Sequence, residues 1–89
     1  MKRNTSFLLR QVAGKQVVVP LGRAAVDFPG MLTLNDSGVY LWELLEKSQT
    51  VDTLVAAMCE KYAVEETVAR EDIAIFLGKL RQVGALCEE

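Results

Sequence analysis

Histidine is missing from the 89 residues of this chain, and cysteine occurs only twice, at Cys59 and Cys87. Histidine is the commonest general base at neutral pH and the commonest zinc ligand, so its absence argues against acid–base catalysis and against a zinc site. The two cysteines lie far apart and form no Cys-x-x-Cys motif. We expect two reduced thiols in a cytoplasmic protein, with a disulfide as the open alternative.

Long apolar runs and phosphate-binding loops are also missing. No segment approaches the roughly 18 consecutive apolar residues of a membrane span. The basic start at Lys2 and Arg3 is followed by no apolar run typical of a signal peptide. No Gly-x-Gly-x-x-Gly motif occurs, and no nucleophile has a histidine partner. We therefore expect no enzyme, no cofactor, no metal and no membrane contact.

What the chain does contain fits one folded domain over residues 1–89. Hydrophobic residues make up 51% of it and charged residues 25%, which suffices for a single core and argues against disorder. The charge is uneven: residues 1–34 carry five basic residues and one acid, whereas 35–89 carry five basic residues and eleven acids. This split suggests two different surfaces, although charge runs are usually solvated faces.

The first third of the chain has the composition of β-strands. Residues 5–13 and 16–22 are rich in β-branched and large apolar residues, and Gly14-Lys15 between them predicts a hairpin turn. A connection of small residues, closed by Pro29-Gly30, then leads to a short third strand at Met31–Leu34.

Helical signals follow this strand. Asn35, with Asp36 as second candidate, predicts the cap of a helix that carries the only tryptophan and ends near Lys47-Ser48. Thr50 predicts the cap of a second helix over residues 50–63. The second helix has apolar residues at helical spacing, which predict a buried stripe: Val51, Leu54, Val55, Met58 and Tyr62.

A third helix is expected from Glu65 or Glu66 to Gly84, before a short strand at 85–87. Its apolar positions predict a core face: Ala69, Ile73, Phe76, Leu77, Leu80 and Val83. Beside that face lies a row formed by Arg70, Ala74, Leu77 and Arg81. By its spacing alone, the row favours a core boundary over which arginine stems lie, with one wall of a groove as the alternative.

The second and third helices, joined by a tight turn, suggest a helix-turn-helix that could read DNA. The first turns of the third helix would then meet the bases. That stretch reads EETVARED and is strongly acidic, so phosphate repulsion makes nucleic-acid binding the weaker interpretation.

An ordered set of residues between 34 and 86 resembles the coenzyme PQQ synthesis protein D (PqqD) family. The matching segments read LNDSGVYLWELL, TVDTLV, EKYAV and EDIAIFLGKLRQVGAL. The resemblance rests on Asn35, Gly38, Trp42, Thr50, Val51, Tyr62, Val64, Asp72, Phe76, Leu77, Leu80, Gly84 and Leu86.

The resemblance implies an α+β fold: a winged helix-turn-helix-like domain with a three-stranded N-terminal antiparallel sheet followed by three helices. It implies a non-catalytic chaperone that binds the leader of a ribosomally made precursor peptide and presents it to a modifying enzyme. A radical SAM maturase is the expected enzyme, in PQQ biosynthesis or another pathway. The protein itself would be a monomer or a weak homodimer.

The leader is expected to add as a strand beside the third strand, in the cleft toward the third helix. Trp42 and Leu45 would then be core residues beneath that strand. The implied peptide-binding residues are Met31, Leu32, Thr33, Leu34, Arg70, Ile73, Ala74, Leu77 and Arg81. On this hypothesis Leu32→Pro, Arg70→Glu and Arg81→Glu should each weaken binding.

Two other functions stay open from the sequence. One is a winged-helix DNA-binding regulator, which would show affinity for duplex DNA and strong salt dependence. The other is an oligomerisation module that pairs through the same edge strand, which would show a concentration-dependent mass.

Overall fold

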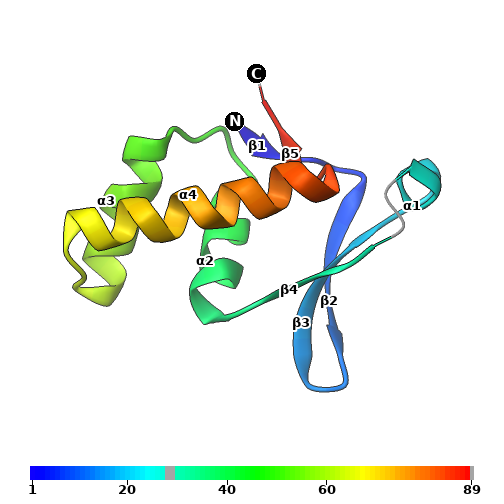
Figure 1. The fold of residues 1–89 in the computed structure, drawn as a ribbon, viewed down its shortest axis with the longest axis horizontal. Coiled ribbons are helices and arrows are strands. Elements are labelled where there is room, and N and C mark those ends of the chain that lie inside the picture. The colour runs from blue at the N-terminus through cyan, green and yellow to red at the C-terminus, as the bar shows by residue number, and fades with distance from the viewer. Residues whose placement is uncertain (28–29, 89) are drawn as a thin grey trace.

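The computed structural model describes residues 1–27 and 30–88 of the chain. It is a flat α+β domain of 38 × 32 × 18 Å in which a three-stranded antiparallel sheet lies beside four helices (Figure 1). The predicted α+β class and the three-stranded antiparallel sheet are thus confirmed.

The sheet has the strand order β2-β3-β4, formed by β2 (Phe7–Val12), β3 (Lys15–Pro20) and β4 (Leu32–Leu34). The hairpin turn is Ala13–Gly14, one residue before the predicted position, because Val12 pairs with Lys15. Ala13 and Gly14 have φ values of 52° and 79°, which is the left-handed pair that a type I′ turn requires.

The connection between β3 and β4 contains a short helix that the sequence analysis did not predict, α1 (Arg23–Asp27). Arginine and alanine favour a helix, and the N–H groups of Ala24 and Ala25 bond to the carbonyls of Leu21 and Gly22. The expected turn at Pro29-Gly30 falls partly outside the described residues, since Pro29 is not among them.

Three further helices follow: α2 (Asp36–Leu44), α3 (Val51–Tyr62) and α4 (Glu66–Val83). The predicted caps are confirmed, because Asn35 accepts from the N–H of Gly38 and Thr50 accepts from the N–H of Thr53. Helix α2 ends at Leu44, before the predicted Lys47-Ser48. The N–H groups of Glu46 and Lys47 bond three residues back, as in a 3₁₀ turn, and this tightens the end of the helix.

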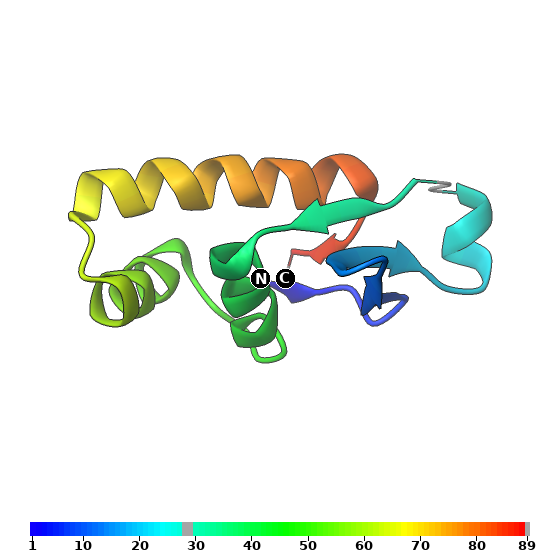
Figure 2. The same ribbon diagram turned by 90° about the horizontal axis from the view of Figure 1, so that it is seen from below.

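The core is formed by α2, α3 and α4 together with the inner side of the sheet, and Figure 2 shows α4 and β4 side by side along one face. Trp42 and Leu45 are buried, as expected. The predicted core face of α4 is buried except for Val83, which is half-buried. On α3 the predicted stripe is buried only in its middle, since Val51 and Tyr62 are exposed.

The two chain ends form a second, two-stranded sheet of β1 (Lys2–Arg3) and β5 (Leu86–Cys87). The sequence analysis expected β5 but not β1. The terminal amine of Met1 also donates to the carbonyl of Gln49 at 3.0 Å, which joins the N-terminus to the α2–α3 connection. Cys59 and Cys87 are free thiols, as the preferred interpretation predicted.

Candidate functional site: the cleft between the edge strand and the last helix

The hydrogen-bonding pattern of the hairpin determines which strand groups are free. A two-residue loop makes its flanking residues, Val12 and Lys15, a hydrogen-bonded pair, and such pairs alternate along an antiparallel ladder. The N–H of Leu21 donates to the carbonyl of Ser6 at 2.8 Å, which agrees with this alternation. The odd-numbered residues of β3 therefore direct their N–H and C=O groups at β2.

The even-numbered residues of β3 direct theirs at β4. Gln16 pairs with Leu34 and Val18 pairs with Leu32, so both leucines use their backbone groups within the sheet. Thr33 lies between them, and its N–H and C=O point away from β3. Since β4 has no other neighbour in the sheet, Thr33 supplies the hydrogen-bonding groups at its open edge.

The start of α2 anchors one end of this edge strand. The Asn35 side chain accepts from the N–H of Gly38 at 2.9 Å and from the Ser37 hydroxyl at 3.1 Å. A Cβ atom on Gly38 would lie 3.2 Å from Asn35 Oδ1 and 3.3 Å from Leu34 Cβ, so a larger residue would disturb the cap. This close packing explains why the strand passes directly into the helix.

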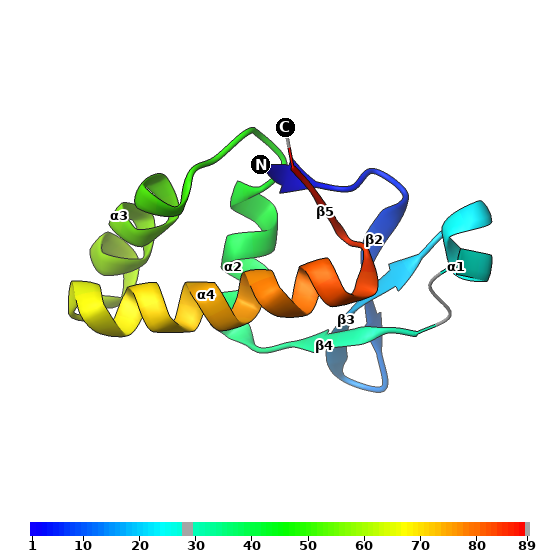
Figure 3. The ribbon, with the colours of Figure 1, turned by 45° about the horizontal axis from the view of Figure 1, so that its top comes forward.

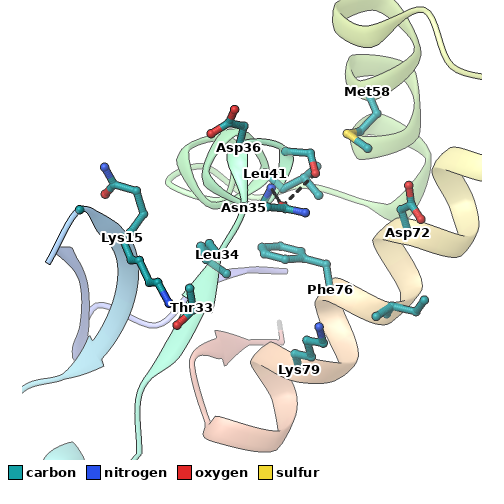
Figure 4. A pocket seen from close by; sticks show the side chains of 15 residues that line it. Lys15, Thr33, Leu34, Asn35, Asp36, Leu41, Met58, Asp72, Phe76 and Lys79 are labelled. Atoms are coloured by element: carbon teal, nitrogen blue, oxygen red, sulfur yellow. Dashed lines mark hydrogen bonds between the residues drawn. The ribbon is translucent and has the colours of Figure 1, made fainter. Parts of the chain in front are cut away.

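A cleft of about 620 Å³ separates the end of β4 from α4 (Figure 4). Leu34 and Phe76 point toward one another across it, and both are mostly buried. Leu41 of α2 and Met58 of α3 complete the apolar base. The wall on α4 consists of Asp72, Ile75, Phe76 and Lys79.

The cleft combines an exposed apolar residue with charges that lack ion-pair partners. Ile75 is 59% exposed, so most of its side chain is accessible to a ligand in the cleft. Among the described residues, Asp72 and Lys79 on α4 and Asp36 and Lys15 opposite them form no ion pair.

The structure places two of the four predicted strand residues at the cleft and the predicted helix residues elsewhere. Thr33 and Leu34 line the cleft, Leu32 belongs to β4, and Met31 lies just before β4 with 63% of its surface exposed. Ile73 and Leu77 are buried in the core. Ala74 is exposed and does not line the cleft.

The two predicted arginines lie on the opposite flank of α4. Arg70 bonds Glu66 and Asp52, each at 2.9 Å, in a shallow depression between α3 and α4. Its hydrogen bonds to Glu66 and then Asp52 raise the pKa of its guanidinium above the ordinary value. Arg81 pairs with Glu88 beyond the end of α4. The peptide-binding role of these arginines stays a prediction.

The sequence analysis missed the residues that α4 does contribute. Asp72, Ile75 and Lys79 are spaced i, i+3 and i+7, so they form a row beside Phe76 on the other edge of the core face. The sequence feature that could have identified this edge of α4 is Ile75, a large apolar residue that falls outside the predicted buried arc.

Comparison with known proteins agrees with this architecture. The family model of coenzyme PQQ synthesis protein D (PqqD) matches residues 8–86. The chain belongs to the PqqD family. The match includes the whole three-stranded sheet apart from Phe7, and all four helices, so both walls of the cleft lie within the PqqD match.

Two solved structures resemble this PqqD-family chain over nearly its full length. The first is described as TbiB1 in complex with the TbiA(beta) leader peptide, with 22% identity, a TM-score of 0.77, and coverage of 100% of this chain and 98% of that one. The second is lasso peptide synthetase B1 complexed with the leader peptide, with 21% identity, a TM-score of 0.73, and coverage of 98% and 96%. A search of curated proteins found no match. At these identities the neighbours establish a shared fold.

The described part of the PqqD-family chain contains no group of three or more histidine, cysteine, aspartate or glutamate residues placed to hold a metal ion. Within the same residues, no helix is long and apolar enough to cross a membrane.

Proposed function

We propose that this chain is a non-catalytic recognition domain that binds the leader segment of a ribosomally made precursor peptide. The leader pairs as an added strand with the open edge of β4 and lays side chains into the cleft toward α4. The observation that carries the proposal is an unpaired strand edge, at Thr33, that adjoins a cleft with an apolar base and an exposed isoleucine on its far wall. Both solved neighbours are described as complexes with leader peptides, which supports the same role here.

The bound leader brings the precursor to a separate modifying enzyme in the cytoplasm. Family resemblance predicts a radical SAM enzyme, whereas one structural neighbour is described as part of a lasso peptide synthetase. Co-purification of this chain with each candidate enzyme encoded beside its gene, with and without the precursor, distinguishes these two classes.

The proposal is tested by titrating labelled protein with the short peptide encoded beside its gene while following amide chemical shifts. We expect the shifts to concentrate on residues 31–38 and on the Asp72–Lys79 side of α4. Unchanged spectra at millimolar peptide, together with shifts on adding duplex DNA, would instead support the DNA-binding alternative.

A proline scan of the two sheet edges gives a matched control. Thr33→Pro removes the donor at the open edge of β4, and we expect affinity to fall about two- to twelvefold because one backbone hydrogen bond contributes roughly 0.5–1.5 kcal/mol. Gln11→Pro removes the equivalent outward donor on β2, the other edge, and should leave affinity unchanged. Equal effects of both variants would contradict strand addition at β4.

Leu32→Pro, the variant that the sequence suggested, is a poorer test. The Leu32 N–H points at Val18 within the sheet, so proline there removes a structural hydrogen bond and destabilises the fold.

A further inference from the structure

The cleft has opposite charges at its two ends. In Figures 1 and 3, β4 and α4 run in opposite directions, so the early turns of α4 lie toward the start of α2 and its later turns lie toward the start of β4. Figure 4 labels both α4 residues: Asp72 lies on the side of Met58, and Lys79 lies on the side of Thr33, toward which the Lys15 side chain also reaches. Leu34 and Phe76 lie between the two ends.

These charges are available to a ligand. The remaining cations near α4 are already paired, since Arg70 contacts Asp52 and Glu66 and Arg81 contacts Glu88. Asp72 and Lys79 have no ion-pair partner among the described residues, and both side chains are exposed. An incoming peptide with the complementary charge order would pair both, and one with the reverse order would meet repulsion at both ends.

The spacing of the charges sets the spacing on the ligand. Seven helical residues separate Asp72 from Lys79, which corresponds to about 10 Å at a rise of 1.5 Å per residue. On an extended strand, side chains that share one face recur every two residues, or about 6.7 Å. Two charged side chains of the ligand, four positions apart, can therefore reach Asp72 and Lys79. The ligand side chain midway between them is directed at the apolar base of the cleft.

We infer that the cleft selects a leader segment that reads basic-x-apolar-x-acidic from its N-terminus to its C-terminus. The order follows from antiparallel pairing with β4, the commoner strand arrangement, which places the N-terminal residue near Asp72 and the C-terminal residue near Lys79. The central apolar side chain contacts Leu34, Phe76 and Ile75. This inference rests on the proposed function and adds to it the chemistry of the bound segment.

The test compares two blocked heptapeptides of identical composition, Thr-Lys-Thr-Leu-Thr-Glu-Thr and Thr-Glu-Thr-Leu-Thr-Lys-Thr, by amide-shift titration of the full chain. We expect the first to bind about five- to tenfold more tightly, because each exposed charge pair contributes modestly and the reverse order is repulsive. The difference should shrink in about 0.5 M salt, where the Debye length is only a few ångströms.

A charge-reversed protein provides the decisive comparison. Asp72→Lys combined with Lys79→Asp keeps the net charge of −2 and should invert the preference between the two peptides. Glu46→Lys combined with Lys47→Asp makes the same change away from the cleft and should leave the preference unaltered.

Three results would overturn the inference. The first is equal affinity for the two peptides, and the second is a preference that the charge reversal leaves unchanged. The third is an absence of cleft shifts with either peptide at about 5 mM, a concentration at which even millimolar binding produces shifts. The proposed function would stand in all three cases if the genomically encoded precursor still shifts the cleft amides. The proposed function itself would be contradicted if the genomically encoded precursor did not bind to the protein.

Discussion

Both flanks of α4 carry charged residues, but the two flanks differ in whether those charges have ion-pair partners. On the flank toward α3, Arg70 pairs with Asp52 and Glu66. On the flank toward β4, Asp72 and Lys79 have no ion-pair partner within the described part of the chain. The family resemblance suggested the first flank as a binding wall, whereas the contacts favour the second. A charge that is already paired within the protein interacts less strongly with a charged ligand than an unpaired charge does.

The largest effects should come from the two buried neighbours that face opposite flanks. Phe76→Ala and Leu77→Ala should each lower the free energy of unfolding by about 2–5 kcal/mol, since both remove a buried apolar side chain. Chemical denaturation measures this loss. Under conditions where each variant is folded, only Phe76→Ala should also weaken peptide binding, because Phe76 alone of the two lines the cleft.

A smaller effect, confined to binding, is expected at exposed positions of α4. Ile75→Ser should leave the free energy of unfolding within about 0.5 kcal/mol but lower peptide affinity several-fold, since an exposed apolar contact would be lost. Val68→Ser is the matched control: Val68 is 44% exposed on the same helix and does not line the cleft. Calorimetric titration of both variants would reveal whether the exposed isoleucine acts in binding or merely lies on the surface.

The smallest effect is expected on the paired flank. Arg70→Gln should change stability little, because its ion pairs are exposed to solvent and screened by it. Its effect on peptide affinity should be smaller than that of Lys79→Gln measured in parallel. A larger loss of affinity for Arg70→Gln would return the binding wall to the flank that the sequence predicted.

Much of the fold was predictable because its signals are local. The caps at Asn35 and Thr50, the end of α4 at Gly84 and the buried arc of α4 each depend on neighbours within one or two turns. The β1–β5 pair was not predicted in full, because two residues from each chain end carry no periodic pattern.

The candidate site was predicted on the strand side and not on the helix side. Helical periodicity identifies the buried arc of α4 and the two rows at its edges, but it does not say which row faces β4. That choice depends on how α3 packs against α4, since α3 covers the Arg70 edge and leaves the Asp72 edge open. The hairpin turn was also misplaced by one residue, since it lies at Ala13–Gly14 and not at Gly14-Lys15. The position of this turn sets the strand register, and the register determines which backbone groups of β4 point outward.

The pairing of β1 with β5 has a practical consequence for handling the protein. Figures 1 and 3 place both chain ends together, on the side of α4 away from β4. A tag or a surface attachment at either terminus therefore leaves the cleft unobstructed. By the same geometry, a host polypeptide could enter at Lys2 and leave at Cys87, so this unit is suited to being spliced whole into a loop of another protein.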